Sequence, residues 1–221
     1  YNHSVGDGFK YFSNLIKKIK LTTIKHISVN WKEGWTGILN AHFWLKDEFS
    51  SYLGSVNNGG GCIHEHSHGI HFLVCIERIL KFKLNNEPNS FINFKKKNKK
   101  LFYDNFVNIN WKFKNFSVNY STDLISEPAD KSLTIYTKDK KFELIINDEK
   151  KYDTIKILNY KTSSISIKRF KKKRATDFKN EIKHMIKINN KKLYEKSFIT
   201  LENGLRVQQI INSVLKNEKS F

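Results

Sequence analysis

The sequence predicts an α+β domain built on one large, mainly antiparallel, open β-sheet with helices on one face. Between about residues 90 and 170, apolar residues recur at every second position, and short polar turns at 137–141 and 147–150 join neighbouring segments. Helical periodicity occurs before and after this region. Strands gathered in the middle of a chain, with helices at both ends, are typical of the α+β class.

The first third of the chain contributes two helices, one strand and one long loop. Apolar residues at helical spacing predict a helix over 9–19, and alternation predicts a strand over 22–33. The segment 34–58 is irregular and rich in aromatic residues, which is more typical of a functional loop than of a simple connection. A helix is predicted over 62–80, and its later part is apolar nearly all round, so we expect it to be buried.

Seven further strands and two helices complete the chain. The strands are predicted at 90–94, 106–113, 116–124, 132–137, 141–146, 152–160 and 164–167. Many of them alternate Phe or Ile with Lys or Asn, so one face is packed and the other is more polar. Thr176 can cap one closing helix, with Asp177 in its first turn, and the last helix begins at about Glu202.

The composition indicates a single globular domain, 1–221, because no Pro-rich or Gly/Ser-rich linker divides the chain. The net charge of +19 raises the alternative of a basic, non-enzymatic binding module. Only four of the 40 basic residues are Arg, however, and Arg is the residue that clamps phosphate and reads base edges. We therefore expect no nucleic-acid partner.

The cysteines and the hydropathy pattern favour a cytoplasmic protein. Cys62 and Cys75 lie in one predicted helix, too far apart to pair, so a reducing compartment is expected. No apolar run approaches the ~20 residues of a membrane span, so no membrane partner is expected. The chain begins at Tyr1, and residues 1–8 have the character of the middle of a protein, so we expect a C-terminal piece of a longer chain.

The densest group of chemically active residues lies at the start of the predicted 62–80 helix. At 100° per residue, His64, His68 and His71 share one face, and Glu65 lies beside His68 at spacing i,i+3. His66 points to the opposite side and is expected to be structural. Three imidazoles and one carboxylate therefore converge on one side of the helix.

One interpretation of this cluster is a zinc metallohydrolase, because His64-Glu65-x-x-His68 matches the H-E-x-x-H pattern. In that pattern two histidines one turn apart bind Zn²⁺ and the glutamate activates water. A third ligand is required, and His71 is too close along the helix to provide it. Short motifs also arise by chance where histidine is dense, so we predict no metal site.

The second interpretation is a dehydrogenase. Gly59, Gly60 and Gly61, followed by Glu65, His68 and His71, resemble the signature helix of the glucose–fructose oxidoreductase and inositol dehydrogenase (Gfo/Idh/MocA) family. That family has the pattern G-G-G-x-x-x-D-x-x-x-H-x-x-D. In this chain Glu65 replaces the first Asp, one residue is missing before His68, and His71 stands at the place of the final Asp.

The resemblance extends over nearly the whole chain in the same order. Further matching segments are Tyr1-Asn2-His3, Val29-Asn30-Trp31, Trp44, Ser51-Tyr52-Leu53, Asp177-Phe178 with Glu181-Ile182, and the stretch 202–206. The resemblance implies that this chain is the C-terminal substrate-binding half of an NAD(P)-dependent oxidoreductase that acts on a sugar or cyclitol hydroxyl. The N-terminal Rossmann domain and its catalytic lysine are absent from these residues, since Gly6-Asp7-Gly8 lacks the third glycine of a dinucleotide-binding loop.

Roles for individual residues follow from the resemblance. His68 would be the acid/base and Glu65 would orient it or bind a hydroxyl, while the three glycines would let the helix start approach the nicotinamide of NAD or NADP. The substrate would contact His64, His71, Trp35, Trp44, Tyr52 and Asn2. The resemblance also implies a homodimer or homotetramer formed through the sheet, since a bare Phe-rich face would expose an apolar patch.

Overall fold

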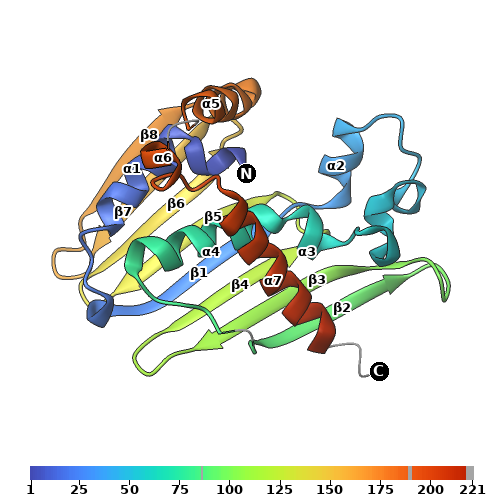
Figure 1. Ribbon diagram of the computed structural model, residues 1–221, viewed down its shortest axis with the longest axis horizontal. Helices are drawn as coiled ribbons and strands as arrows, with labels where there is room; N and C mark the ends of the chain where they lie inside the picture. The colour runs from blue at the N-terminus through green and yellow to red at the C-terminus, as the bar shows by residue number, and fades with distance from the viewer. Residues whose placement is uncertain (86, 189–190, 218–221) are drawn as a thin grey trace.

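The computed structural model describes residues 1–85, 87–188 and 191–217, and its centre is one eight-stranded sheet (Figure 1). The strand order is β2-β3-β4-β1-β5-β6-β7-β8. The strands are β1 Ile24–Lys32, β2 Asn89–Lys96, β3 Phe102–Lys112, β4 Ser117–Asp123, β5 Asp130–Thr137, β6 Lys140–Asp148, β7 Tyr152–Asn159 and β8 Ile165–Lys171. Each overlaps a segment in which alternation predicts a strand, so the α+β class with a mainly antiparallel open sheet is confirmed.

The first strand in the sequence occupies the middle of the sheet. β1 pairs in parallel with β4 and antiparallel with β5, and the remaining neighbours among the described strands are antiparallel. Ile27, Val29 and Trp31 of β1 are buried on one face. With neighbours on both edges and helices above, β1 forms the floor on which the site is built.

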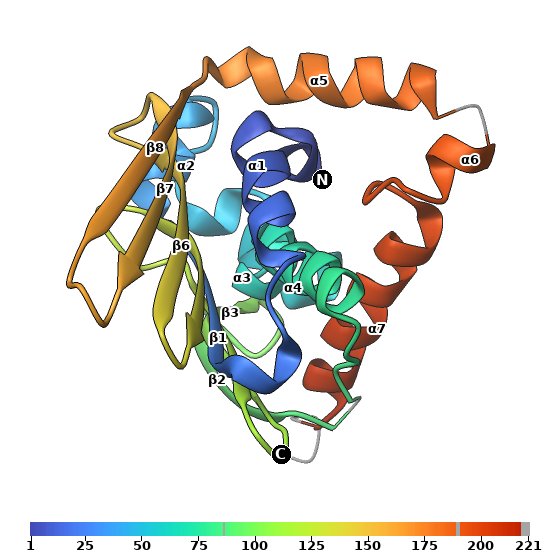
Figure 2. The ribbon, with the colours of Figure 1, turned by 90° about the vertical axis from the view of Figure 1, so that its left-hand side faces the viewer.

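The helices are α1 Asp7–Ile16, α2 Trp35–Ala41, α3 Cys62–Glu65, α4 Ser67–Leu80, α5 Arg174–Lys187, α6 Lys191–Tyr194 and α7 Leu201–Asn217. Short 3₁₀ turns are η1 Asn2–Val5, η2 Leu21–Thr23, η3 Glu48–Ser50, η4 Tyr52–Gly54 and η5 Val56–Asn58. Figure 2 shows α1, α4 and α7 on one side of the sheet, with the other face free of them. α4 lies on β1, and α7 packs on α4.

Two predicted elements differ in the structure. The segment 34–58 is not irregular, because it contains α2 and three 3₁₀ turns. The predicted 62–80 helix is broken at His66, whose φ of −95° and ψ of 21° interrupt the helical path. The hydroxyl of Tyr120 on β4 donates to the carbonyl oxygen of His66 at 2.7 Å, so a sheet side chain replaces part of the helical bonding there.

Gly69 allows α4 to pack closely on the sheet because it has no side chain. A Cβ atom at Gly69 would lie 2.5 Å from Cε2 of Tyr120 and 3.0 Å from Cβ of Trp31. Neither contact can relax easily, since Tyr120 is fully buried and hydrogen-bonded. The glycine therefore sets the height of α4, and of the residues at its start, above β1 and β4.

The face of the sheet away from the helices carries polar side chains at its centre. The side chain of Asn119 donates to the side-chain oxygens of Asn108, at 3.2 Å, and Asn110, at 2.9 Å. Nearby, Nδ1 of His26 lies 2.8 Å from Oγ of Ser117. The centre of this face is therefore polar, while Phe91, Ile165 and Ile167 towards its edges are exposed. Contact of another subunit with the sheet stays a prediction.

Two further expectations concern membranes and disulfides. None of the helices in the described part of the chain is both long and apolar enough to cross a bilayer. Cys62 and Cys75 are buried free thiols, as their positions in the sequence predict.

Substitution of Gly69 by Ala should lower the free energy of unfolding by about 1–3 kcal/mol, because the new methyl group overpacks the α4–sheet contact. Gly204→Ala in α7 is the matched control, since a Cβ there meets nothing within 4 Å. That control should raise stability by about 0.5–1 kcal/mol through helix propensity. Urea unfolding measures both, and equal effects at the two positions would contradict the packing argument.

Candidate functional site

The three glycines before α3 have different roles in the structure. Gly59 and Gly61 have φ of 78° and 95°, both in the region that favours glycine. A Cβ atom at Gly61 would lie 1.8 Å from Oδ1 of Asp104, and one at Gly60 would lie 2.1 Å from the carbonyl oxygen of Tyr52. Gly60 and Gly61 are therefore needed for packing within the chain, and Gly59 alone has open space beside it.

Asp104, on β3, holds the start of α3. Its Oδ2 accepts a hydrogen bond from the backbone N–H of Ile63 at 2.8 Å and lies 3.1 Å from Sγ of Cys62. Burial raises the pKa of Asp104, and the Ile63 N–H partly opposes this effect. Burial also raises the pKa of the Cys62 thiol, which makes this cysteine a poor nucleophile.

His66 at the helix break is structural, as predicted. Its Nδ1 lies 2.9 Å from Oγ1 of Thr122, whose hydroxyl donates to the carbonyl oxygen of Trp31 at 2.7 Å. Nδ1 of His66 is therefore the donor, and the ring is neutral. Burial lowers the pKa of His66 to about 3.

His71 is also enclosed by the protein. Its Nε2 donates to the carbonyl oxygen of Phe198 at 3.0 Å, and its ring stacks on Tyr1 with centroids 4.1 Å apart. Burial lowers its pKa to about 3. These contacts tie α4 to η1 and to the segment before α7, so His71 supports the site from behind.

His68, the predicted acid/base, lies at the centre of an aromatic cage. Its ring centroid is 5.2 Å from that of His3, 5.5 Å from that of Tyr1 and 5.7 Å from that of Trp31. The ring is partly exposed, but its Nδ1 is buried and has no hydrogen-bond partner among the described residues. Burial lowers the pKa of His68 to about 2, and the positive charges of His3 and the Tyr1 amine lower it further.

A second imidazole lies between His68 and a carboxylate. Nδ1 of His3 lies 3.0 Å from Oδ2 of Asp177 at the start of α5. Lys172 donates to the same carboxylate at 2.8 Å, and these two partners hold the pKa of Asp177 below its ordinary value although burial opposes them. His3 is thus oriented from behind and presents its ring to His68.

Glu65 belongs to a charged group at the end of β1. Nζ of Lys131 lies 2.6 Å from Oε2 of Glu33 and 5.8 Å from the ring centroid of Trp31. Burial raises the pKa of Glu65, the Glu33 carboxylate raises it further, and Lys131 and His42 oppose the shift. Glu65 is therefore easier to protonate than an ordinary glutamate.

The aromatic segment after β1 reaches the same group. Burial and the charge of Glu65 raise the pKa of Tyr52, whose side chain is 58% exposed. Trp44 is 64% exposed, and its ring lies edge-on to His42 with centroids 5.2 Å apart. Tyr52 and Trp44 are thus exposed aromatic residues, and their contact with a substrate stays a prediction.

The remaining predicted substrate residues occupy other surroundings. Nε1 of Trp35 donates to the hydroxyl of Tyr103 at 2.9 Å, which fixes α2 on β3. Asn2 is buried within η1. His64 is partly exposed, with a buried Nδ1 that has no partner within the described residues. The roles of Trp35, Asn2 and His64 as substrate contacts stay predictions.

The zinc interpretation does not fit this geometry. α3 ends at Glu65, so the pair His64 and His68 spans the break at His66 and does not lie on one continuous helix. In the described ranges of the chain, no three His, Cys, Asp or Glu side chains are grouped as a metal site requires.

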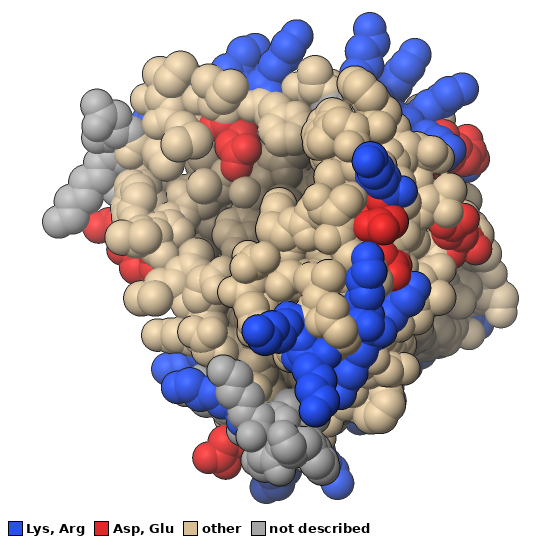
Figure 3. Space-filling view, turned by 90° about the vertical axis from the view of Figure 1, so that its right-hand side faces the viewer, with Lys and Arg blue, Asp and Glu red and all other residues tan. Residues whose placement is uncertain are grey.

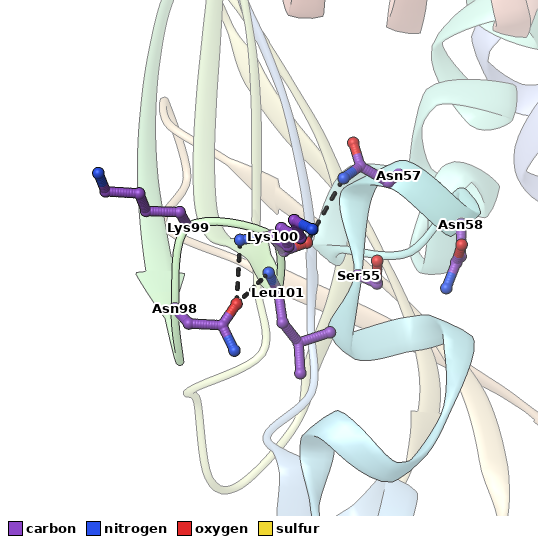
Figure 4. A pocket seen from close by; sticks show the side chains of 7 residues that line it. All are labelled: Ser55, Asn57, Asn58, Asn98, Lys99, Lys100 and Leu101. Atoms are coloured by element: carbon purple, nitrogen blue, oxygen red, sulfur yellow. Dashed lines mark hydrogen bonds between the residues drawn. The ribbon is translucent and has the colours of Figure 1, made fainter.

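One side of the molecule carries a hollow. Figure 3 shows the side at the right of Figure 1, where the hollow is bordered mostly by uncharged side chains, with an acidic side chain at its upper edge and basic side chains below it. A separate open pocket of about 610 Å³ lies at the β2–β3 turn (Figure 4). Its lining includes Asn57, Asn58, Lys99 and Lys100, and none of the predicted site residues.

Four site residues were missed by sequence reasoning: His3, Glu33, Lys131 and Asp177. Glu33 is the last residue of the predicted first strand and Lys131 directly precedes another predicted strand, so polar residues at strand ends were the available signal. Together the site offers a neutral imidazole, a carboxyl group with a raised pKa and an ion pair beside a tryptophan. This set can exchange a proton and bind hydroxyl groups.

The structure is similar to several solved oxidoreductases. Levoglucosan dehydrogenase, in complex with NADH and levoglucosan, matches with a TM-score of 0.67 and 10% identity over 97% of this chain and 62% of its own. An oxidoreductase from Sinorhizobium meliloti matches with a TM-score of 0.67 and 8% identity over 99% of this chain and 61% of its own. An NAD binding oxidoreductase from Klebsiella pneumoniae matches with a TM-score of 0.65 and 9% identity, over 100% and 63%.

Because the sequence identities are low, these likenesses show the fold alone. The chain spans about 60% of the length of the first proteins that it matches. No family model matches the sequence, and no curated protein matches it significantly.

The buried histidines should make stability depend on pH. The pKa values of His66, His68 and His71 lie far below the ordinary 6.5, so the folded state binds fewer protons than the unfolded state between about pH 6.5 and 3. The free energy of unfolding should therefore fall as the pH drops through this window, by up to about 4 kcal/mol per pH unit for three groups. Urea unfolding between pH 7.5 and 5 measures this slope.

His71→Gln provides the control for that slope. In this variant one imidazole fewer takes up a proton on unfolding, so the slope of the free energy of unfolding against pH should be smaller by up to about 1.4 kcal/mol per pH unit. This change in slope is independent of the effect of the substitution on absolute stability. A free energy of unfolding that stays constant from pH 7.5 to 5 would show that these imidazoles titrate normally.

Proposed function

We propose that this chain is the C-terminal, substrate-binding half of an NAD(P)-dependent oxidoreductase of the Gfo/Idh/MocA type, which acts on a hydroxyl of a sugar or cyclitol. The observation that carries the proposal is the position of His68, which stands beside Trp31 at the end of β1, directly after the glycine turn and the helix break. The fold likeness to levoglucosan dehydrogenase supports it.

The proposed chemistry divides between the cofactor and this chain. NAD or NADP, held by a preceding dinucleotide-binding domain, would take the hydride from the carbinol carbon. His68 would accept the hydroxyl proton through its partly exposed ring. Part of the lowering of its pKa comes from the Tyr1 amine, and a peptide bond at that nitrogen would remove this charge and make His68 a stronger base.

Glu65 and the Lys131–Glu33 pair would bind the other hydroxyl groups of the substrate. A carboxylate accepts hydrogen bonds from a diol and an ammonium group donates them, so these side chains can fix a ring on which several hydroxyl groups point outward. Tyr52 and Trp44 would cover the ring with exposed aromatic surface. His64 would complete this side.

The glycine turn fits a cofactor at Gly59. Open space beside Gly59 lets another molecule approach the backbone, whereas Gly60 and Gly61 are occupied by the chain itself. Among residues 59–61, only Gly59 could thus contact a nicotinamide ring. The rest of the dinucleotide would be bound by the preceding domain.

A homodimer or homotetramer through the sheet, in the cytoplasm, belongs to the same proposal. Its interface would be polar in the centre, along the ladder of Asn108, Asn110 and Asn119. Exposed Ile165 and Ile167 on β8 would supply its apolar margin.

In the longer protein, His68→Gln should lower kcat/KM about 10²–10⁴-fold, because the variant lacks the group that accepts the proton. Affinity for NADH should not change, since the substitution leaves the preceding domain intact. His26→Gln, on the opposite face of the sheet, is the control and should keep full activity. A panel of sugars and cyclitols with NAD and NADP identifies the substrate through the absorbance of the reduced cofactor.

Two outcomes would contradict the proposal at different levels. A longer protein that binds neither NADH nor NADPH would remove the dehydrogenase. Cofactor-dependent turnover that survives in His68→Gln would keep the dehydrogenase and assign its base elsewhere.

A further inference from the structure

The apolar face of helix α5 is exposed and does not pack on the protein. Its apolar residues lie at spacing i, i+4, i+7 and i+8, which forms one stripe. All four are exposed: Phe178 at 54%, Ile182 at 59%, Met185 at 56% and Ile186 at 72%. Figure 2 shows α5 at the edge of the molecule, away from the helices that cover the sheet.

The polar side of α5 faces the protein. Asp177 is buried against His3 and Lys172, and Glu181 lies 3.0 Å from the N-terminal nitrogen of Tyr1. Nε2 of His184 lies 2.7 Å from Oγ of Ser197. Charged and polar contacts therefore fix the orientation of α5, and the helix cannot rotate its stripe inward without breaking them.

An exposed stripe of this kind indicates a surface that is covered in the working protein. We propose that the α5 stripe, Phe178, Ile182, Met185 and Ile186, is the docking surface for the domain that precedes Tyr1, so this inference rests on the proposed function. The backbone nitrogen of Tyr1 lies on Glu181, so a segment that enters the chain there arrives beside the stripe. An amide at this position keeps a hydrogen to donate to the same carboxylate.

The length of similar proteins is consistent with this occupant. The chain covers 60–64% of five solved oxidoreductases that match nearly all of it, so each of them has a further part of domain size. A domain on the α5 stripe would lie next to η1, where His3 and Tyr1 contact His68. The N-terminal segment with Tyr1 and His3 would therefore lie beside both the docking surface and the proposed acid/base, His68.

Met185 provides a direct probe, because it is the only methionine in the 221 residues. Hydrogen peroxide is added to the 221-residue chain and to the longer protein, and peptide mass spectrometry follows sulfoxide formation at Met185. The thioether should react at least about tenfold more slowly in the longer protein, because an interface shields it from the oxidant. Ile182→Glu in the longer protein should restore fast oxidation, whereas Lys183→Glu, a neighbouring exposed position, should keep the protection.

The other occupants of the stripe have their own outcomes. Equal rates in the two chains would overturn the proposal, and so would protection of the 221-residue chain that grows with its concentration, which indicates a second copy. Protection of both chains only by phosphatidylserine vesicles would assign the stripe to a membrane surface. NADH binding is measured on the same samples. Protection of Met185 in a longer protein that does not bind NADH would support the docking surface and contradict the dehydrogenase. NADH binding without protection of Met185 would contradict the docking surface alone.

Discussion

The break between α3 and α4 depends on β4, and the geometry of the candidate site depends on that break. Tyr120 donates to the carbonyl oxygen of His66, and Thr122 links Nδ1 of His66 to the carbonyl oxygen of Trp31. These bonds lie in the interior, where an unmade hydrogen bond costs about 1–3 kcal/mol, so they outweigh the preference of the segment for a continuous helix. As a result, Glu65 ends one helix and His68 begins another.

Glycines on both sides of the break allow α3 and α4 to pack closely on the sheet. Gly61 lets the start of α3 approach Asp104, and Gly69 lets α4 approach Tyr120 and Trp31. The triple-glycine motif resembles a cofactor-binding feature in sequence, but two of its three members are occupied by the chain itself. Gly60 and Gly61 thus act by positioning the neighbouring residues of the chain.

The strands could be predicted from the sequence because each has one buried face, and alternation is a local signal. The position of β1 in the middle of the sheet, parallel to β4, depends on contacts between distant segments that local patterns do not contain. The same limit applies to the site. His64, Glu65 and His68 are neighbours in sequence, so a local pattern can group them, whereas His3 and Asp177 come from opposite ends of the chain and meet only in the fold.

α5 shows how charge can decide which face of a helix is buried. Its periodicity predicts a helix, but a hydrophobic stripe alone would place Phe178 and Ile182 against the core. Asp177 and Glu181 instead bind Lys172, His3 and the Tyr1 nitrogen. The Asp177–Lys172 pair is nearly buried, and breaking a buried pair costs about 3–5 kcal/mol. The apolar stripe is therefore displaced outward by the same contacts that hold His3 against His68. The same contacts therefore hold His3 beside His68 and leave the stripe exposed, so the proposed proton-transfer group and the proposed docking surface have one physical cause.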